Sequence, residues 1–219
     1  MMGALKFTSV VAFFCLQVSF HAFSQSESTI TDERDGQVYR IKSINGTTWM
    51  LDNLNYHSQL SLAADSSKNH APPGRFYHLN ELDSVCPPKW IVSRKEDWLT
   101  YFEYIVDNLG DSTIKITENK MDEIVEIDYW GKIDIFNLIN PLEINHTAWV
   151  EGGQWFDSKM MEPPSAHFWV LEPQRDEPER THVHFDGDIR IRIHRHKHHL
   201  KPNQEKKLRR FMVRCVKCE

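Results

Sequence analysis

Only one segment of the chain has the apolar spacing of a long helix, and it covers residues 93–109. Ser93-Arg94-Lys95-Glu96 begins it with the pattern of a capping box, because Glu96 lies three residues after the capping serine. Gly110 ends the run. The apolar residues at helical spacing are Trp98, Leu99, Phe102, Ile105, Val106 and Leu109. Since no second long helical pattern follows, the sequence predicts an α+β fold with a loop-rich second half of short strands.

The first part of the chain has the pattern of a β-hairpin. Residues 38–44 alternate between apolar and polar side chains, Asn45-Gly46 is a two-residue turn signal, and residues 47–51 continue as a second strand. Residues 57–74 are polar and end in Pro72-Pro73-Gly74, which indicates a loop. We expect a second, short helix over residues 80–85, directly before a cysteine.

The start of the chain has the pattern of an export signal. Lys6 precedes an apolar run over residues 7–20, and the small residues Ala22 and Ser24 fit a signal-peptidase site. The run is too short to span a bilayer, so we predict no transmembrane segment. The expected organisation is a cleaved signal peptide over residues 1–24, a loose polar leader over 25–31 and a single domain over 32–217. The mature protein would be exported to the periplasm, the outer membrane surface or the medium.

Three cysteines remain after that cleavage: Cys86, Cys215 and Cys218. An exported chain matures in an oxidising compartment, where one disulfide and one free thiol are the expected outcome. We prefer the pair Cys86–Cys215, and Cys86–Cys218 stays open as the alternative. Cys215 and Cys218 together do not indicate a metal site, because two thiolates make only half of a structural zinc site.

Charge is distributed unevenly along the chain, whose formal net charge is −5. Residues 187–217 contain 11 Lys and Arg against 2 Asp and Glu. Around the start of this basic region, residues 181–185 and 189–194 alternate between polar and apolar side chains, which predicts a hairpin. A three-residue loop over 186–188 would place Phe185 opposite Ile189, and a wider loop stays open. The apolar positions of both strands are expected in the core: Val183, Phe185, Ile189, Ile191 and Ile193.

The polar positions of this hairpin would then form an outward face of histidine and arginine. Arginine forks suit carboxylate or phosphate groups, and histidines would strengthen anion binding as pH falls through about 6.5. The candidate anion-binding residues are His182, His184, Arg190, Arg192, His194 and His196. A plain solvated face is one alternative. Another is a transition-metal site, with the candidate ligands His194, His196, His198 and His199. Arg195 and Lys197 lie between these histidines and would repel a cation.

Five motifs follow one another in a distinctive order: Asp35-Gly36-Gln37-Val38-Tyr39, Trp49-Met50-Leu51-Asp52-Asn53-Leu54-Asn55-Tyr56, Gly74-Arg75-Phe76-Tyr77, Val85-Cys86-Pro87-Pro88-Lys89-Trp90 and Val213-Arg214-Cys215-Val216-Lys217. This order resembles the Fibrobacter succinogenes major paralogous domain, a family of exported bacterial proteins, over about residues 32–217. The resemblance implies a C-type-lectin-like fold with two short helices and a twisted, mostly antiparallel sheet. Such a fold does not by itself imply a function.

The resemblance also bears on the cysteines. The family's terminal cysteine matches Cys215, which supports the pair Cys86–Cys215 and leaves Cys218 as an extra thiol. The chain departs from the family directly after Cys86. The family's Cys-Pro-x-Gly-Trp is Cys86-Pro87-Pro88-Lys89-Trp90 here, and its following Arg-Leu-Pro is Ile91-Val92-Ser93. The local turn can therefore differ from that of the family.

The sequence contains no established catalytic motif. Gly-x-Ser-x-Gly, a Gly-rich phosphate loop and His-Glu-x-x-His are absent, and no cysteine pair matches that of the related formylglycine-generating enzymes. The carboxylates over residues 122–134 are typical of a solvated face. Glu172-Pro173-Gln174 is only weakly similar to the loop of calcium-dependent lectins.

We therefore predict an exported, non-catalytic module that binds glycans or other anionic surface ligands and needs no cofactor. The alternative is an enzyme of unknown chemistry on a lectin-like scaffold. Export disfavours nucleic acid as a partner, although a basic patch alone would permit it.

Overall fold

The computed structural model describes residues 28–64, 73–109, 112–118, 122–129, 142–144, 148–151, 154–157, 165–171, 180–186, 190–196 and 209–218. Within them the named strands pair antiparallel, and the helical elements are α1 (Lys95–Leu109) and a 3-10 turn, η1 (Leu79–Glu81). This is an α+β fold, as predicted. The second expected helix, over residues 80–85, is present only as η1. In the described part of the chain, no helix has the length and apolar character needed to cross a bilayer.

The first sheet brings together the two ends of the described chain. Its strands, in spatial order, are β1 (Ser28–Thr31), β2 (Val38–Ile44), β3 (Thr47–Met50), β14 (Cys215–Lys217) and β6 (Trp90–Val92). The predicted hairpin is confirmed, because β2 and β3 are paired and are connected by Asn45 and Gly46, with φ angles of 46° and 88°. Positive φ at both residues is the geometry of a type I′ turn, for which Asn-Gly is the preferred sequence.

The leader expected over residues 25–31 is wrong for its last four residues. Ser28–Thr31 form β1, which pairs with β2 so that Ile30 lies opposite Tyr39. Ile30 is partly buried and packs on the core cluster that contains Tyr39. The segment is thus placed by its pairing along the edge of β2 and by the packing of Ile30. The predicted signal peptide over residues 1–24 lies outside the described residues.

Strand β14 enters the middle of the first sheet and is held there covalently. Its Val216 lies opposite Trp49 of β3 on one side and opposite Ile91 of β6 on the other. Cys215 forms a disulfide with Cys86 across 129 residues of sequence, and Cys218 is a free, exposed thiol. The predicted pair Cys86–Cys215 is confirmed, and the alternative pair is wrong.

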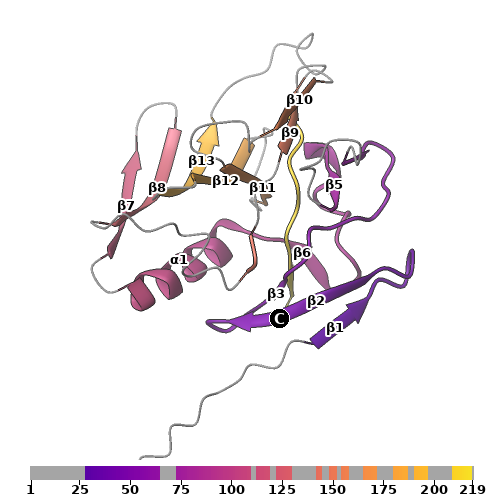
Figure 1. The fold of residues 1–219 in the computed structure, drawn as a ribbon, viewed down its shortest axis with the longest axis horizontal. Coiled ribbons are helices and arrows are strands. Elements are labelled where there is room, and N and C mark those ends of the chain that lie inside the picture. The colour runs from indigo at the N-terminus through magenta and orange to yellow at the C-terminus, as the bar shows by residue number, and fades with distance from the viewer. Residues whose placement is uncertain are drawn as a thin grey trace, which may run out of the picture.

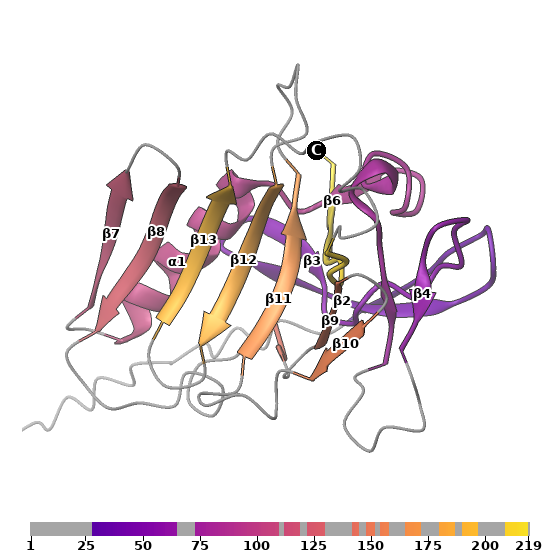
Figure 2. The same ribbon diagram turned by 90° about the horizontal axis from the view of Figure 1, so that it is seen from above.

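The second sheet is built from later parts of the chain. Its strands, in spatial order, are β11 (Ser165–Val170), β12 (Arg180–Asp186), β13 (Arg190–His196), β8 (Asp122–Tyr129) and β7 (Ser112–Glu118). Figure 2 shows these five strands side by side in front of α1. The expectation of short strands in this half does not hold for this sheet, whose strands are 6 to 8 residues long. Charged residues interleaved with Ile and Val on β8 and β13 are themselves a strand signal.

The predicted hairpin of β12 and β13 is present, but its register differs from the expected one by two residues. Phe185 lies opposite Ile191 and Val183 lies opposite Ile193, so the loop covers residues 187–189. A shift of two residues keeps every side chain on its own face of the sheet. Val183, Phe185 and Ile193 are buried as predicted. Ile189 and the side chain of Ile191 lie outside the described part of the structure.

Helix α1 begins one residue later than the sequence predicts, and Arg94 rather than Ser93 is its N-cap, because Arg94 O accepts the first helical hydrogen bond, from Trp98 N at 3.2 Å. Asp97 Oδ2 accepts a hydrogen bond from the backbone N–H of Arg94 at 2.7 Å, which is the role expected of Glu96. Ser93 is not the cap because its backbone is used in strand pairing. Its N–H donates to Arg214 O at 3.0 Å, and its carbonyl accepts from Leu171 N at 2.9 Å.

Both sheets and α1 share one apolar core. Figure 1 shows α1 below the second sheet, on the side of the first sheet. The centroid of the Trp98 ring lies 4.8 Å from that of Trp49 in the first sheet and 5.6 Å from that of Phe185 in the second. Trp98, Phe102 and Ile105 are buried, which confirms the predicted apolar stripe of the helix at these positions.

The C-terminal segment 209–214 connects the two sheets before it continues as β14. Phe211 bridges to Tyr77, and Met212 bridges to Phe168 of β11. Two small pairs complete the described part: β4 (Leu62–Ala63) with β5 (Arg75–Phe76), and β9 (Ala148–Glu151) with β10 (Gln154–Asp157).

Candidate ligand-binding site

A cleft of about 520 Å³ lies where the first sheet meets the start of α1. This volume is in the usual range of small-molecule sites in proteins. The cleft is lined by the β2–β3 turn, by β6, by the first turn of the helix and by the end of β14. Its lining residues are Gly46, Thr47, Thr48, Ile91, Arg94, Asp97, Val216, Lys217 and Cys218.

The local folding described above explains why these four segments meet. The type I′ turn carries Thr47 and Thr48 toward the helix, and Asn45 Nδ2 donates a hydrogen bond to Thr100 O at 3.4 Å. The pairing of β14 between β3 and β6 brings Lys217 to the same place. The backbone N–H of Cys218 donates to Lys89 O at 3.0 Å, which holds the last described residue against the loop before β6.

The cleft contains two cationic side chains and one carboxylate. The ion pairs of the described residues are Arg34 with Asp32, and Arg40 with Asp52 and Glu143. Arg94 and Lys217 therefore line the cleft without an ion pair to a described residue, and both are exposed. Asp97 is within electrostatic range of Arg94. Strand β3 adds two further polar groups to the lining, the hydroxyl groups of Thr47 and Thr48.

The single carboxylate of the lining, Asp97, has a perturbed acidity. Burial raises the pKa of Asp97, and the hydrogen bond from the backbone N–H of Arg94 opposes this only in part. The carboxyl group is thus easier to protonate than an ordinary aspartate. The charge of the lining therefore becomes more positive as the pH falls.

The histidine and arginine face predicted on β12 and β13 is not the exposed surface that the alternation suggested. His182 is only 4% exposed, and His184 is half-buried. The expectation that His182 points to solvent is wrong because other parts of the chain cover it. Its ring lies 4.7 Å from Phe211, and the ring of His184 stacks at 4.0 Å on His167 of β11.

The remaining residues of that predicted face are placed only through their backbone. Arg190, Arg192, His194 and His196 lie on β13, and their side chains are outside the described part of the structure. The register places Glu126 of β8 opposite Arg192, Glu123 opposite Arg195 and Asp122 opposite His196. The basic strand β13 therefore has an acidic strand of its own sheet as its neighbour. Opposite charges at cross-strand positions attract each other. The carboxylates that we interpreted as a solvated face are largely on this neighbour.

The candidate metal ligands are likewise placed only in part. His198, His199 and the lectin-like residue Glu172 lie outside the described residues, and His194 and His196 are described by backbone alone. Among the residues that the structure does describe, no group of three or more His, Cys, Asp or Glu side chains is arranged to hold a metal ion.

Comparison with protein-family models, with curated proteins and with solved structures found no match to this chain. The family resemblance stated from the sequence is therefore a prediction that these comparisons leave untested.

Sequence reasoning missed the cleft because its residues come from four separate segments. Arg94 is part of the predicted helix cap and Lys217 is part of the last motif of the family resemblance, and neither pattern indicates a common site. The one available signal was the Asn45-Gly46 turn, which fixes the direction of the hairpin end. The position of that end relative to the helix depends on β14, which lies more than 100 residues later in the chain.

Proposed function

We propose that this chain is an exported, non-catalytic binding module and that its cleft holds an anionic group, such as the carboxylate or phosphate of an envelope glycan. The proposal includes membership of the Fibrobacter succinogenes major paralogous domain family and a C-type-lectin-like relationship of the fold. The α+β architecture with antiparallel sheets is compatible with that relationship. The disulfide between Cys86 and Cys215 supports maturation in an oxidising compartment.

The observation that carries the proposal is the pair of cations in the cleft. Arg94 and Lys217 enter it from two different elements, and neither forms an ion pair with a described residue. A guanidinium group can hold a carboxylate or phosphate with two parallel hydrogen bonds, and an ammonium group adds a point charge. The threonine hydroxyls of the lining can bond the neighbouring hydroxyls of a sugar. The chemistry thus fits an acidic saccharide better than a neutral one.

The lining favours binding over catalysis. Glycoside hydrolysis needs two carboxyl groups that flank the scissile bond. Asp97 is the one carboxylate among the described residues that line the cleft, and its Oδ2 is already bonded to the helix start.

A glycan array tests the proposal directly. The mature protein is applied to carboxylated, phosphorylated and neutral glycans, and we expect retention on the acidic ones that weakens with rising ionic strength. Arg94→Ala and Lys217→Ala should each lower affinity about 2- to 5-fold, because an exposed ion pair contributes up to about 1 kcal/mol. The matched control is Lys115→Ala, which removes one positive charge from β7, at the end of the second sheet that is remote from β14 (Figure 2).

Repeating the array at pH 5.5 and 7.5, with and without EDTA, distinguishes the other sites. Loss of binding with EDTA would mean a metal-dependent site and would contradict the proposal. Binding that is unaffected by both cleft substitutions and rises at pH 5.5 would move the ligand to the histidines of β12 and β13. Equal losses in the control variant would mean that only the net charge of the protein matters.

A further inference from the structure

Arg214 is a buried cation that lacks the partners such a group normally has. It is 2% exposed and lies directly before the disulfide-bonded Cys215. Its Nη1 donates one hydrogen bond, to Met50 O at 3.3 Å, whereas its Nε has no acceptor. It forms no ion pair with a carboxylate of the described residues. A charge taken out of water is costly unless it is paired and hydrogen-bonded, so this guanidinium calls for an explanation.

A second unpaired donor lies next to Arg214 on the neighbouring strand. Cys215 is opposite Val92, and the N–H of Ser93 donates to Arg214 O at 3.0 Å, so Ser93 and Arg214 are cross-strand neighbours. Side chains of directly opposite residues lie on the same face of a sheet. Ser93 is fully buried, and its hydroxyl has no hydrogen-bond partner.

Two indole groups in the same layer also have unpaired N–H donors. Trp49 and Trp98 are fully buried, their rings are in contact, and neither Nε1 has an acceptor. Phe168 connects them to the arginine. The Cζ atom of Arg214 lies 5.4 Å from the Phe168 ring centroid, and the Trp98 ring stacks on the same phenyl ring at 6.1 Å.

The nearby carboxylates do not supply the missing acceptor. Asp52 and Glu143 are within electrostatic range of Arg214, but both bond to Arg40 and both are partly solvated. Burial lowers the pKa of Arg214 to about 10, because these charges and Tyr101 offset its desolvation only in part. A bound anion would raise the pKa of Arg214, because it would favour the charged form of the guanidinium.

We infer that the layer between the first sheet and α1 binds a small inorganic anion, of the halide class, with Arg214 as its main ligand and the Ser93 hydroxyl as a second donor. The unpaired groups of this layer are indole and guanidinium N–H groups and one hydroxyl. A halide ion can accept hydrogen bonds from all of these groups, and its negative charge would also offset the charge of the buried guanidinium. This site is independent of the cleft and of the function proposed for it.

Crystals grown or soaked in sodium bromide give the most direct test. We expect an anomalous peak within hydrogen-bonding distance of Arg214 Nε and Ser93 Oγ. In solution, unfolding by urea is followed in sodium bromide or chloride against sodium gluconate at equal ionic strength. At a halide concentration of 100 times Kd, binding to the folded state alone shifts the folding equilibrium about 100-fold, and the shift follows a one-site curve.

Variants separate this site from a general salt effect. Ser93→Ala should raise the halide concentration needed for half of the stabilisation, and Arg214→Met should abolish the halide dependence. Ser43→Ala, on the exposed face of β2, is the matched control and should behave as the wild type. If Arg214→Met does not fold, the bromide peak and Ser93→Ala still decide. Ordered water without anomalous signal beside Arg214, or equal stability in bromide and gluconate, would overturn the inference.

Discussion

The two sheets of this molecule are held together by different means. In the first sheet, β6 and β14 are only 3 residues long, and β14 contacts β3 through one paired position, Val216 with Trp49. In the second sheet, strands of 6 to 8 residues pair along most of their length. Short strands contribute few ladder hydrogen bonds, so the first sheet needs additional tethers. Those tethers are a disulfide and an ion pair whose carboxylate is buried.

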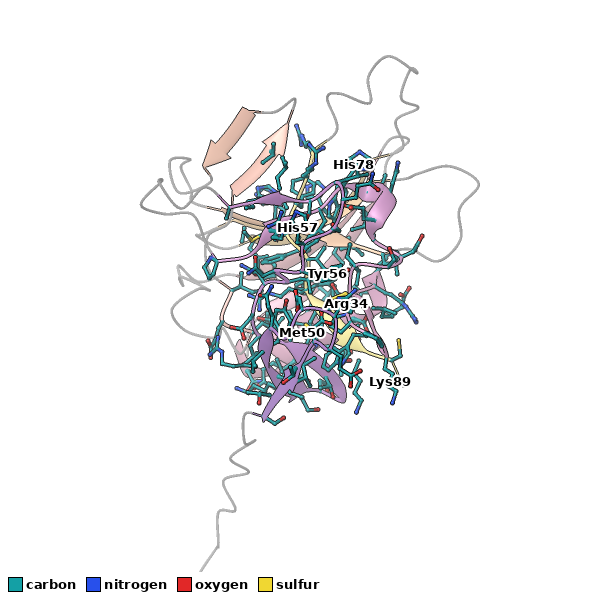
Figure 3. All side chains as sticks on the ribbon, turned by 90° about the vertical axis from the view of Figure 1, so that its right-hand side faces the viewer. Arg34, Met50, Tyr56, His57, His78 and Lys89 are labelled. Carbon is teal, nitrogen blue, oxygen red and sulfur yellow. A yellow bond between two sulfur atoms is a disulfide. The ribbon has the colours of Figure 1, made fainter. Side chains whose placement is uncertain are left out.

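The ion pair fixes the N-terminal turn to the loop that carries Cys86. Asp32 is fully buried, and its Oδ2 accepts from Arg34 Nη2 at 2.7 Å. The same guanidinium donates to Ser84 O and Val85 O and lies 3.8 Å above the ring of Tyr56. Figure 3 shows Arg34 and Tyr56 as neighbours. Arg34 thus has a carboxylate partner, which Arg214 lacks among the described residues, and its guanidinium donates to two carbonyl groups, whereas that of Arg214 donates to one. Both arginines lie next to strands of the first sheet.

Removing the disulfide should have the largest effect on stability. Cys86→Ala is expected to lower the free energy of unfolding by about 4–5 kcal/mol, because the bond closes a loop with a sequence separation of 129 residues. Urea unfolding of the variant, and of the wild type with and without dithiothreitol, measures this loss. Hydrogen exchange should locate it: amides of β14 and β6 should lose protection before those of β12 and β13. Cys218→Ser is the control and should not differ from the wild type. Equal loss of protection in both sheets would contradict the distinction between them.

Breaking the buried ion pair should have the next largest effect. Asp32→Ala leaves the guanidinium of Arg34 without its carboxylate, and removal of one partner of a buried pair costs about 3–5 kcal/mol. The matched control is Arg40→Ala. Its side chain is 41% exposed and pairs with Asp52 and Glu143, so its loss should cost about 1 kcal/mol or less. Thermal unfolding of both variants gives the comparison. Similar losses would mean that burial does not decide the strength of these pairs.

The same carboxylate should make the first sheet sensitive to acid. The hydrogen bonds and charge of Arg34 hold the pKa of Asp32 below its usual value, even though its burial acts in the opposite direction. A lowered folded-state pKa gives stability that is present above about pH 4 and is lost as the pH falls below it. Unfolding of the wild type should therefore become easier from pH 4 to pH 2, and Asp32→Asn should flatten this dependence. An unchanged slope in Asp32→Asn would assign the acid sensitivity to other groups.

Features of the fold that depend on local contacts could be predicted from the sequence, whereas features that depend on distant contacts could not. The β2–β3 hairpin was predicted because its turn residues, Asn45 and Gly46, lie within it. The register of β12 and β13 was predicted with the correct faces but shifted by two residues, because alternation fixes only which side a residue faces. In neither register does Gly187 fall at the last loop position, where the common three-residue turn favours glycine.

The errors arose where a distant segment competes for the same backbone or surface. Ser93 has the sequence of a helix cap, but its backbone pairs with Arg214 and Leu171, and the cap moved to Arg94. His182 has the pattern of a solvent-facing residue, but Phe211 covers it. Neither partner can be found from local periodicity, since each lies more than 20 residues away in sequence. The cleft was missed for the same reason.

A conservative core substitution in the second sheet tests whether the stability of that sheet depends on the disulfide of the first sheet. Ile193 is buried and lies opposite both Val183 and Val125. Ile193→Val removes one methylene and should cost about 0.5–1.5 kcal/mol. Because no disulfide joins the described strands of this sheet, the loss should be the same with and without dithiothreitol. Urea unfolding under both conditions measures it, and a loss that grows on reduction would show that the sheets are energetically coupled.

The smallest expected effect belongs to Asp97, which lies on the helix between the two sheets. Burial raises its pKa, so the folded state disfavours the ionised form, and stability should fall slightly as the pH rises through that value. Asp32 gives the opposite slope. Asp97→Asn keeps an oxygen that can accept from Arg94 N, removes the charge, and should change stability by less than about 1 kcal/mol, with a gain at pH 7. Unfolding of Asp97→Asn and of the wild type at pH 4, 5.5 and 7 tests the sign. A loss at pH 7 that exceeds the loss at pH 4 would mean that the negative charge at the helix start outweighs its burial.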